Sequence, residues 1–82
     1  MGIVRDTKVQ MVVNDARRAY TEGRYVFVAR LNSSTRLKST SGSVGDWAEM
    51  IEAVEAEGWA LAEWTVGGGP KLPSAYPLFR RR

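Results

Sequence analysis

The residues of this sequence that could do chemistry begin with a group of carboxylates. Glu49, Glu52 and Glu55 follow one another at intervals of three within an amphipathic segment. Carboxylates act as general acid and base, or hold a hard cation, when they face one pocket together. A spacing of three spirals around the outer side of a helix instead of converging. We therefore interpret them as a solvated helix face, with a docking surface for a basic partner as the alternative.

A glycine-rich segment is superficially similar to a phosphate-binding loop. It runs Gly67-Gly68-Gly69-Pro70-Lys71. A true loop of that class has the pattern Gly-x-x-x-x-Gly-Lys-Ser/Thr and opens a helix whose amide groups hold the phosphates. Here Pro70 removes an amide donor, and Leu72-Pro73 prevents a helix from following at once. We interpret the segment as the flexible tip of a hairpin.

Aromatic and basic residues in the segment 24–30 have a faint likeness to the stacking strand of RNA-recognition domains. Tyr25 and Phe27 would fall on one face of a strand, as rings that stack on bases require. That face also carries Ala29 and Leu31, which marks it as the side that packs on the core. We therefore expect a structural strand here.

Cysteine and histidine are both absent from the 82 residues, which removes several classes of active site at once. Thiol nucleophiles, disulfides, histidine bases, Ser-His-Asp triads and nearly all structural zinc sites are excluded. Hydrophobic residues make up 44% and charged residues 26%, which is ordinary usage for a globular domain. We therefore expect a non-enzymatic protein with no catalytic, metal-binding or cofactor-binding residues.

The formal net charge of +3 conceals three blocks of different sign. Residues 1–45 carry +5, residues 46–63 carry −6 and residues 64–82 carry +4. Such segregation favours the pairing of unlike faces over a uniformly basic nucleic-acid surface. The sequence has no secretory signal and no stretch of about 18 apolar residues. We expect a cytoplasmic protein without a membrane partner.

Hydrophobic periodicity and turn residues predict the elements that position these groups, in the order α-β-α-β-β. We expect helices over 7–22 and 46–57, strands over 24–31, 59–66 and 75–81, and a flexible Ser/Thr-rich loop over 32–45. Residues 1–82 then form one α+β domain, in which a helical extension precedes a β-α-β-β core over 24–82. The expected sheet is three-stranded and mainly antiparallel, with both helices on one face. Because Pro77 would remove a donor from a central strand, the last strand either starts there or lies at an edge.

A resemblance to a known family rests on two segments of the sequence. They are Glu55-Ala56-Glu57-Gly58-Trp59-Ala60-Leu61 and Tyr76-Pro77-Leu78-Phe79-Arg80-Arg81. Over residues 24–82 the chain resembles a family of small bacterial domains of unknown function from actinobacteria and their phages. The resemblance implies a β-α-β-β sheet with one packed helix and no assigned activity. Within the motif, we expect Gly58 to end the helix in a left-handed conformation, Trp59 to wedge between helix and sheet, and Leu61 to continue that strand face.

The aromatic content exceeds what one small sheet with helices on a single face can cover. Three tryptophans, three tyrosines and two phenylalanines are present. We therefore expect an apolar patch on the uncovered sheet face, and the pairing of two such sheets about a two-fold axis as its simplest cover. The residues expected to take part are Val26, Val28, Trp64, Arg80 and Arg81. The function that follows is a self-associating interaction module, with a homodimer or another protein as the partner.

A weak nucleic-acid-binding protein is the alternative interpretation. Its phosphate contacts would come from Arg24, Arg30, Lys38 and the terminal run Arg80–Arg82. A charge run at a free terminus is more commonly a solvated end that keeps a strand edge from pairing. The alternative therefore ranks second.

Overall fold

The computed structural model describes residues 7–32, 44–68 and 73–82. In chain order, its elements are α1 (Thr7–Thr21), β1 (Val26–Val28), β2 (Leu31–Asn32), α2 (Gly45–Glu55), β3 (Trp59–Gly68) and β4 (Pro73–Arg81). The predicted α+β class is confirmed. Most of the predicted loop at 32–45, and the hairpin tip beyond Gly68, lie outside the described residues.

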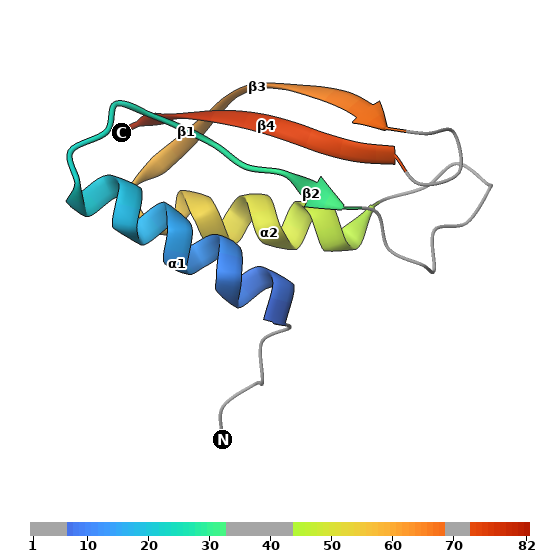
Figure 1. Cartoon of the computed structure of the whole chain (residues 1–82), viewed down its shortest axis with the longest axis horizontal. Coiled ribbons are helices and arrows are strands. Elements are labelled where there is room, and N and C mark those ends of the chain that lie inside the picture. Colours follow the sequence, from blue (N-terminus) through green and yellow to red (C-terminus); the bar gives the residue numbers. More distant parts are fainter. Residues whose placement is uncertain (1–6, 33–43, 69–72) are drawn as a thin grey trace.

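The strand β4 is the centre of the sheet, and every strand pair in the described residues is antiparallel. β3 pairs with one side of β4 in the predicted hairpin, and β1 and β2 pair with the other side (Figure 1). β1 and β2 share one register, in which Val28 lies opposite Leu78 and Leu31 lies opposite Ala75. The predicted strand 24–31 is therefore one path with an interruption, and the sheet has four strands where three were expected.

Pro77 lies inside the central strand, so the expectation that it starts the last strand or marks an edge is wrong. The odd-numbered residues of β4 bond toward β1 and β2. The Ala29 N–H donates to the Pro77 carbonyl at 3.1 Å, and the Arg81 N–H donates to the Tyr25 carbonyl at 3.2 Å. Pro77 has no N–H to return the first of these bonds. The missing donor explains why the ladder is interrupted between β1 and β2 at this level.

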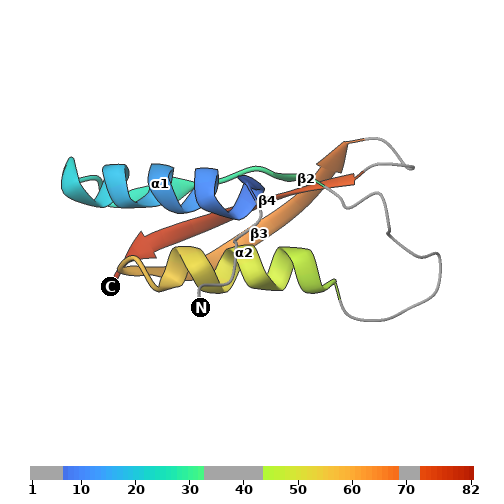
Figure 2. The ribbon, with the colours of Figure 1, turned by 90° about the horizontal axis from the view of Figure 1, so that it is seen from below.

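Both helices lie on the same face of the sheet, as predicted, and no described element covers the opposite face (Figure 1). The helices run side by side beneath the strands (Figure 2). The buried hydrophobic side chains between the two layers are Val9, Val13, Ala16, Ala19, Ala29, Leu31, Trp47, Met50, Ala53, Val54, Trp59, Ala75 and Phe79. Among the described residues, no helix is long and apolar enough to cross a membrane.

Trp59 is the wedge between helices and sheet that the sequence predicts. Its side chain is completely buried, and its Nε1 donates to the Ala16 carbonyl at 3.0 Å. Its ring meets the Tyr20 ring edge-on, with the centroids 5.8 Å apart. Gly58 precedes it with a φ of +101°, so the predicted positive-φ residue after the helix is confirmed. A Cβ at Gly58 would lie 2.5 Å from the Tyr20 ring, so this position also requires a residue without a side chain.

Polar contacts tie α2 to the rest of the fold at its two ends. Near its start, the Trp47 Nε1 donates to the Asn32 carbonyl at 3.0 Å. Just past its end, Glu57 accepts hydrogen bonds from Nε and Nη2 of Arg17 on α1, at 3.0 and 3.1 Å. The hydrogen bond with Glu57, helped by its charge, raises the pKa of the Arg17 guanidinium above its ordinary value. These contacts fix α2 beneath the sheet.

Candidate interaction surface

The central strand β4 determines which side chains face away from the helices. Ala75, Pro77 and Phe79 are buried toward the helices. Because side chains alternate along a strand, the residues between them project from the uncovered face. On that face β4 therefore presents Tyr76, Leu78 and Arg80.

The strand β1 adds two valines to the uncovered face. Val26 pairs with Arg80 and Val28 pairs with Leu78, and paired residues of an antiparallel ladder project to the same side. Val28 is 56% exposed and Tyr76 is 37% exposed. Both valines thus lie on the uncovered face, as the sequence predicts. We call the surface formed by Val26, Val28, Tyr76, Leu78 and Arg80 the outer face.

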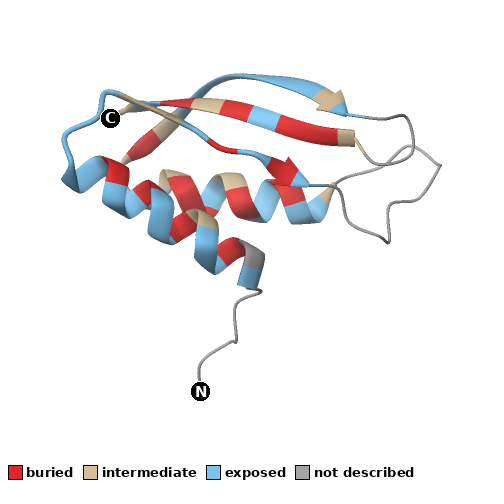
Figure 3. Cartoon of the chain, in the orientation of Figure 1, coloured by how far each residue is buried: buried red, intermediate tan, exposed pale blue. Residues whose placement is uncertain are grey.

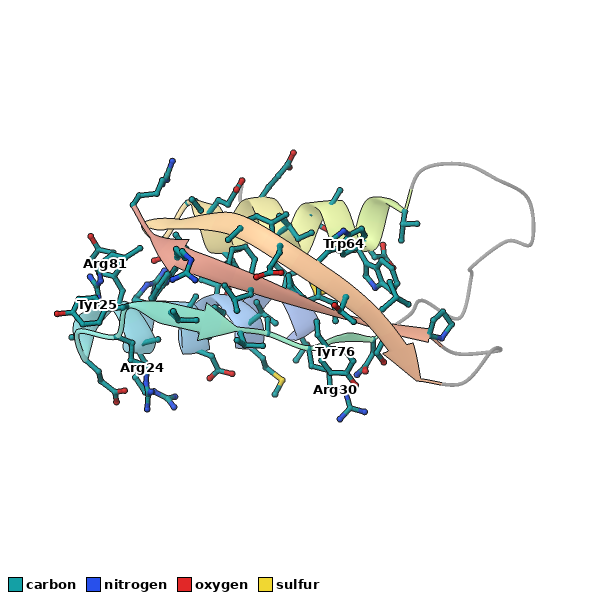
Figure 4. The ribbon with its side chains drawn as sticks, turned by 90° about the horizontal axis from the view of Figure 1, so that it is seen from above. Arg24, Tyr25, Arg30, Trp64, Tyr76 and Arg81 are labelled. Atoms are coloured by element: carbon teal, nitrogen blue, oxygen red, sulfur yellow. The ribbon has the colours of Figure 1, made fainter. Side chains whose placement is uncertain are left out.

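Charged residues flank the apolar centre of the outer face. The shared register of β1 and β2 places Arg30 at the level of Tyr76, and the two side chains lie close together in Figure 4. On the other flank, Glu63 of β3 pairs with Leu78. With Arg30 and Arg80 against Glu63, the outer face and its two flanks together carry an excess of positive charge.

Trp64 lies on the helix side of the sheet, and its predicted place on the uncovered face is wrong. The register of β3 shifts between Leu61 and Glu63, where one extra residue exchanges the two faces of the strand. Beyond this bulge Trp64 pairs with Pro77, and its ring meets the ring of Trp47 edge-on with the centroids 5.9 Å apart. The side chain still remains 49% exposed. The exposed part of the Trp64 side chain therefore lies at the edge of the sheet and not on the outer face.

The strand β3 has a free edge along its second half. Among the described residues only β4 pairs with it, and Figure 3 shows most of the strand exposed. Leu61 continues the face of Trp59, as predicted, and its N–H donates to a carboxylate oxygen of Glu55 at 3.2 Å. Val66, on the same side as Trp64, is 55% exposed. We call residues 63–68 the free edge.

Arg81 has a structural role, which corrects its predicted place in an interaction surface. Its Nε donates to the Arg24 carbonyl at 2.9 Å and its Nη2 donates to the Tyr20 carbonyl at 2.8 Å. The guanidinium carbon lies 4.0 Å from the centroid of the Tyr20 ring. The carbonyls come from the end of α1 and the chain just after it, so Arg81 fastens α1 to the end of β4 (Figure 4).

Arg82 also makes hydrogen bonds within the fold, and Arg80 is the member of the terminal run that projects from the outer face. The Arg82 Nη2 donates to the Glu55 carbonyl at 2.6 Å, and its N–H donates to the Gly58 carbonyl at 3.0 Å. Arg81 and Arg82 are therefore more than a solvated end, because both side chains bond to backbone carbonyls, although Arg82 remains exposed. Arg80 is exposed on the outer face, where it was expected to take part in interaction.

The prediction that Tyr25 and Phe27 share the core face is confirmed for Phe27 alone. The Phe27 ring packs against Trp59 and Phe79, with centroid distances of 5.8 and 6.1 Å. Tyr25 precedes β1 and is 81% exposed at the end of the sheet (Figure 4). The Tyr25 carbonyl still accepts a hydrogen bond from Arg81 of β4, but the Tyr25 ring is not buried between the sheet and the helices.

The carboxylates of α2 do not gather into a site. Glu49 and Glu52 are exposed, as expected for a solvated helix face, and Glu55 accepts the hydrogen bond from Leu61. Within the described ranges, no group of three or more acidic residues could hold a metal ion. The surface features that remain are the outer face and the free edge.

Three members of these surfaces were missed in the sequence. Tyr76 and Leu78 do not follow from the sequence, because a proline predicts the start or the edge of a strand at position 77. Residues 75–79 are all apolar, so the sequence has no alternation there that would have separated Tyr76 and Leu78 from the buried residues between them. Val66 was missed because the bulge in β3 was not recognised.

Comparison with protein-family models, with curated proteins and with solved structures finds no match for this chain. The resemblance to small actinobacterial and phage domains therefore stays a prediction.

Proposed function

We propose that this chain is a non-enzymatic, cytoplasmic protein-interaction module that works as a self-associated assembly, with two copies as its smallest form. The observation that carries the proposal is the apolar surface left uncovered on the outer face and at the free edge. Exposed apolar side chains that adjoin one another are typical of protein–protein contacts. A second copy of the chain covers such a surface about a two-fold axis, without any other component.

The small size of the domain supports association. A chain of 82 residues buries only about 60–65% of its unfolded surface on folding, so its own core supplies limited stability. Beyond Trp59 and Ala60 the strand β3 contributes little to that core, because its side chains from Leu61 to Val66 are exposed. A second copy that covers this part of β3 would bury apolar side chains that the single chain leaves exposed.

Sedimentation velocity over a range of micromolar concentrations tests the proposal. We expect the mass to rise from 9.1 kDa toward twice that value as the concentration increases. Trp64→Glu should keep the chain at the single-copy mass. Met11→Glu is a matched control, because Met11 is an exposed apolar residue on α1. A wild-type chain that stays at 9.1 kDa throughout would remove the proposal.

Weak binding of single-stranded nucleic acid is a second candidate with one observation in its favour. Arg30 flanks the exposed Tyr76 ring, and Arg80 lies on the same face. Stacking on an aromatic ring beside phosphate-binding arginines is how many such proteins bind. Gel shifts at low and moderate salt, with the double variant Arg30→Ala/Arg80→Ala as the probe, decide between the candidates. Salt-sensitive binding that this variant loses would favour nucleic acid.

A further inference from the structure

The free edge of β3 is complementary to a second copy of itself. We propose that two copies pair their β3 strands antiparallel about a two-fold axis at Thr65, which joins two sheets into one continuous sheet. The inference rests on the proposed function, since it names the surface through which self-association takes place.

The hydrogen bonds of β4 determine which backbone groups of β3 point outward. Its odd-numbered residues bond toward β1 and β2, as the contacts of the Pro77 carbonyl and the Arg81 N–H show. The even-numbered residues of β4 therefore bond toward β3, and one of them, Tyr76, lies opposite Thr65. Trp64 and Val66, on either side of Thr65, must direct their N–H and C=O groups away from β4. Among the described residues no strand pairs with these groups, so they are open to water or to a partner strand.

Self-pairing centred on Thr65 provides that partner in a matched way. Trp64 of one copy lies opposite Val66 of the second copy, and Val66 lies opposite Trp64 of the second copy. Each such pair exchanges two backbone hydrogen bonds, so about four form across the axis. Because Trp64 and Val66 project to the helix side, the same pairing brings two apolar side-chain pairs together.

The polar residues of the free edge fit this register as well. Thr65 faces Thr65 of the second copy across the axis, and Glu63 faces Gly67, so like charges are not opposed. Moving the centre by one residue would bring either the bulge at Ala62 or Gly68 into the ladder. Gly68 has a φ of +89°, which is not extended backbone. The register centred on Thr65 is therefore the one that uses regular strand only.

The outer face is the competing surface for a second copy, and its charges disfavour that use. Arg30 and Arg80 outnumber Glu63 there, so face-to-face packing would bring two positive surfaces together. The free edge meets no such repulsion. At its carboxyl end β3 is also the strand farthest from both helices, and no helix or strand that the structure describes lies beyond it (Figure 1). A second copy can therefore approach the edge directly.

A single cysteine at position 65 reports this register, because the chain has no cysteine of its own. Residues that face each other in a non-hydrogen-bonded antiparallel pair have Cβ atoms about 4.5 Å apart, near the ~3.8 Å of a disulfide. We expect Thr65→Cys to form a disulfide-linked dimer under mild oxidation about tenfold faster than Val28→Cys. Val28 is the matched control because it is an exposed strand residue on the outer face. The rates are measured on non-reducing gels.

A charge at the edge provides a second, independent measurement. We expect Val66→Lys to lower the association constant about tenfold or more, because it places a charge opposite the Trp64 ring of the second copy and brings the two lysines diagonally across the axis. Met11→Lys on α1 should leave the constant unchanged, and circular dichroism confirms that both variants fold. Equal effects of the two lysines would overturn the inference, as would equal cross-linking rates of the two cysteines.

The outcomes also separate this inference from the proposed function. If the wild type dimerises, Thr65→Cys does not cross-link faster than its control and Val28→Glu abolishes the dimer, the copies pair through the outer face. The edge pairing is then wrong and the proposed function stands. A wild type that remains a single copy at every concentration overturns both.

Discussion

Replacing Arg81 by alanine is expected to destabilise this fold far more than replacing its neighbour Arg80. Arg81 donates to the Tyr20 carbonyl at 2.8 Å and to the Arg24 carbonyl at 2.9 Å, and its guanidinium covers the Tyr20 ring. Both carbonyls belong to the end of α1 or to the residues that follow it. A cation there also meets the negative end of the helix dipole. The alanine variant loses both hydrogen bonds, the ring contact and the charge–dipole interaction together.

The size of the effect follows from these contacts. A hydrogen bond to a charged group contributes about 1.5–3 kcal/mol, and a cation–π contact at an exposed site about 0.5–1 kcal/mol. Solvent reaches both hydrogen bonds of Arg81, so their contribution lies well below the sum of the buried values. We expect a loss of about 2 kcal/mol, against the ~4–12 kcal/mol typical of a domain of this size. The melting temperature should fall by roughly 8–16 °C.

Urea denaturation followed by tryptophan fluorescence measures this loss, because Trp59 is completely buried in the folded chain. Arg80→Ala is the matched control: it removes the same charge one residue away, and its effect should stay within about 0.5 kcal/mol. Arg81→Lys keeps the charge but lacks the planar fork, so it should fall between the two. Equal midpoints for Arg81→Ala and Arg80→Ala would show that the contacts with α1 contribute nothing, and the reasoning would be wrong.

Further substitutions test the packing around the same corner. Trp59→Phe keeps a buried ring but leaves the Ala16 carbonyl without the indole donor, so we expect a loss of about 1–2 kcal/mol, while Trp59→Ala should lose about 3–5 kcal/mol; thermal melts by circular dichroism measure both. Gly58→Ala forces a φ of +101° and a 2.5 Å approach to the Tyr20 ring, whereas Gly23→Ala meets no atom within 4 Å at a φ of +83°. The first should lose about 2 kcal/mol or more and the second about 1 kcal/mol, and equal urea midpoints would show that the Tyr20 contact is unimportant. Trp47→Phe removes the donor to the Asn32 carbonyl and should lose about 1 kcal/mol with helicity retained, as far-ultraviolet circular dichroism would show.

The helices and the turn from α2 into β3 could be predicted because their signals are local. The predicted helices over 7–22 and 46–57 correspond to α1 (Thr7–Thr21) and α2 (Gly45–Glu55). Gly58 was recognised because a left-handed residue is needed where a helix ends, and Trp59 because a large ring next to that turn must find the core. Each inference uses a few neighbouring residues and no knowledge of the sheet.

The course of the strands could not be predicted in the same way, because it depends on which residues face each other across the sheet. Pro77 weakens a ladder only on the side to which its N–H would point, and that side is set by pairing. The central strand can therefore contain Pro77, and the consequence appears in the partner strand at Ala29 and Arg30. Without knowledge of the pairing, Pro77 predicts the start of a strand or a strand at the edge of the sheet.

The bulge in β3 has the larger consequence for function, and the sequence did contain a sign of it. Counting by twos from Trp59 places Leu61 and Glu63 on the helix side and Trp64 on the outer face. That count would direct the Glu63 carboxylate toward the apolar surface of Trp47, which is unfavourable. An extra residue at Ala62 instead turns Glu63 outward and lets Trp64 and Val66 join the side that Leu61 occupies. The signal is the spacing of the large apolar residues, which is two from Trp59 to Leu61, three from Leu61 to Trp64 and two again to Val66. The same shift places the side chains of Trp64 and Val66, whose backbone groups point outward, together on the helix side. This common placement is what allows β3 to pair with itself.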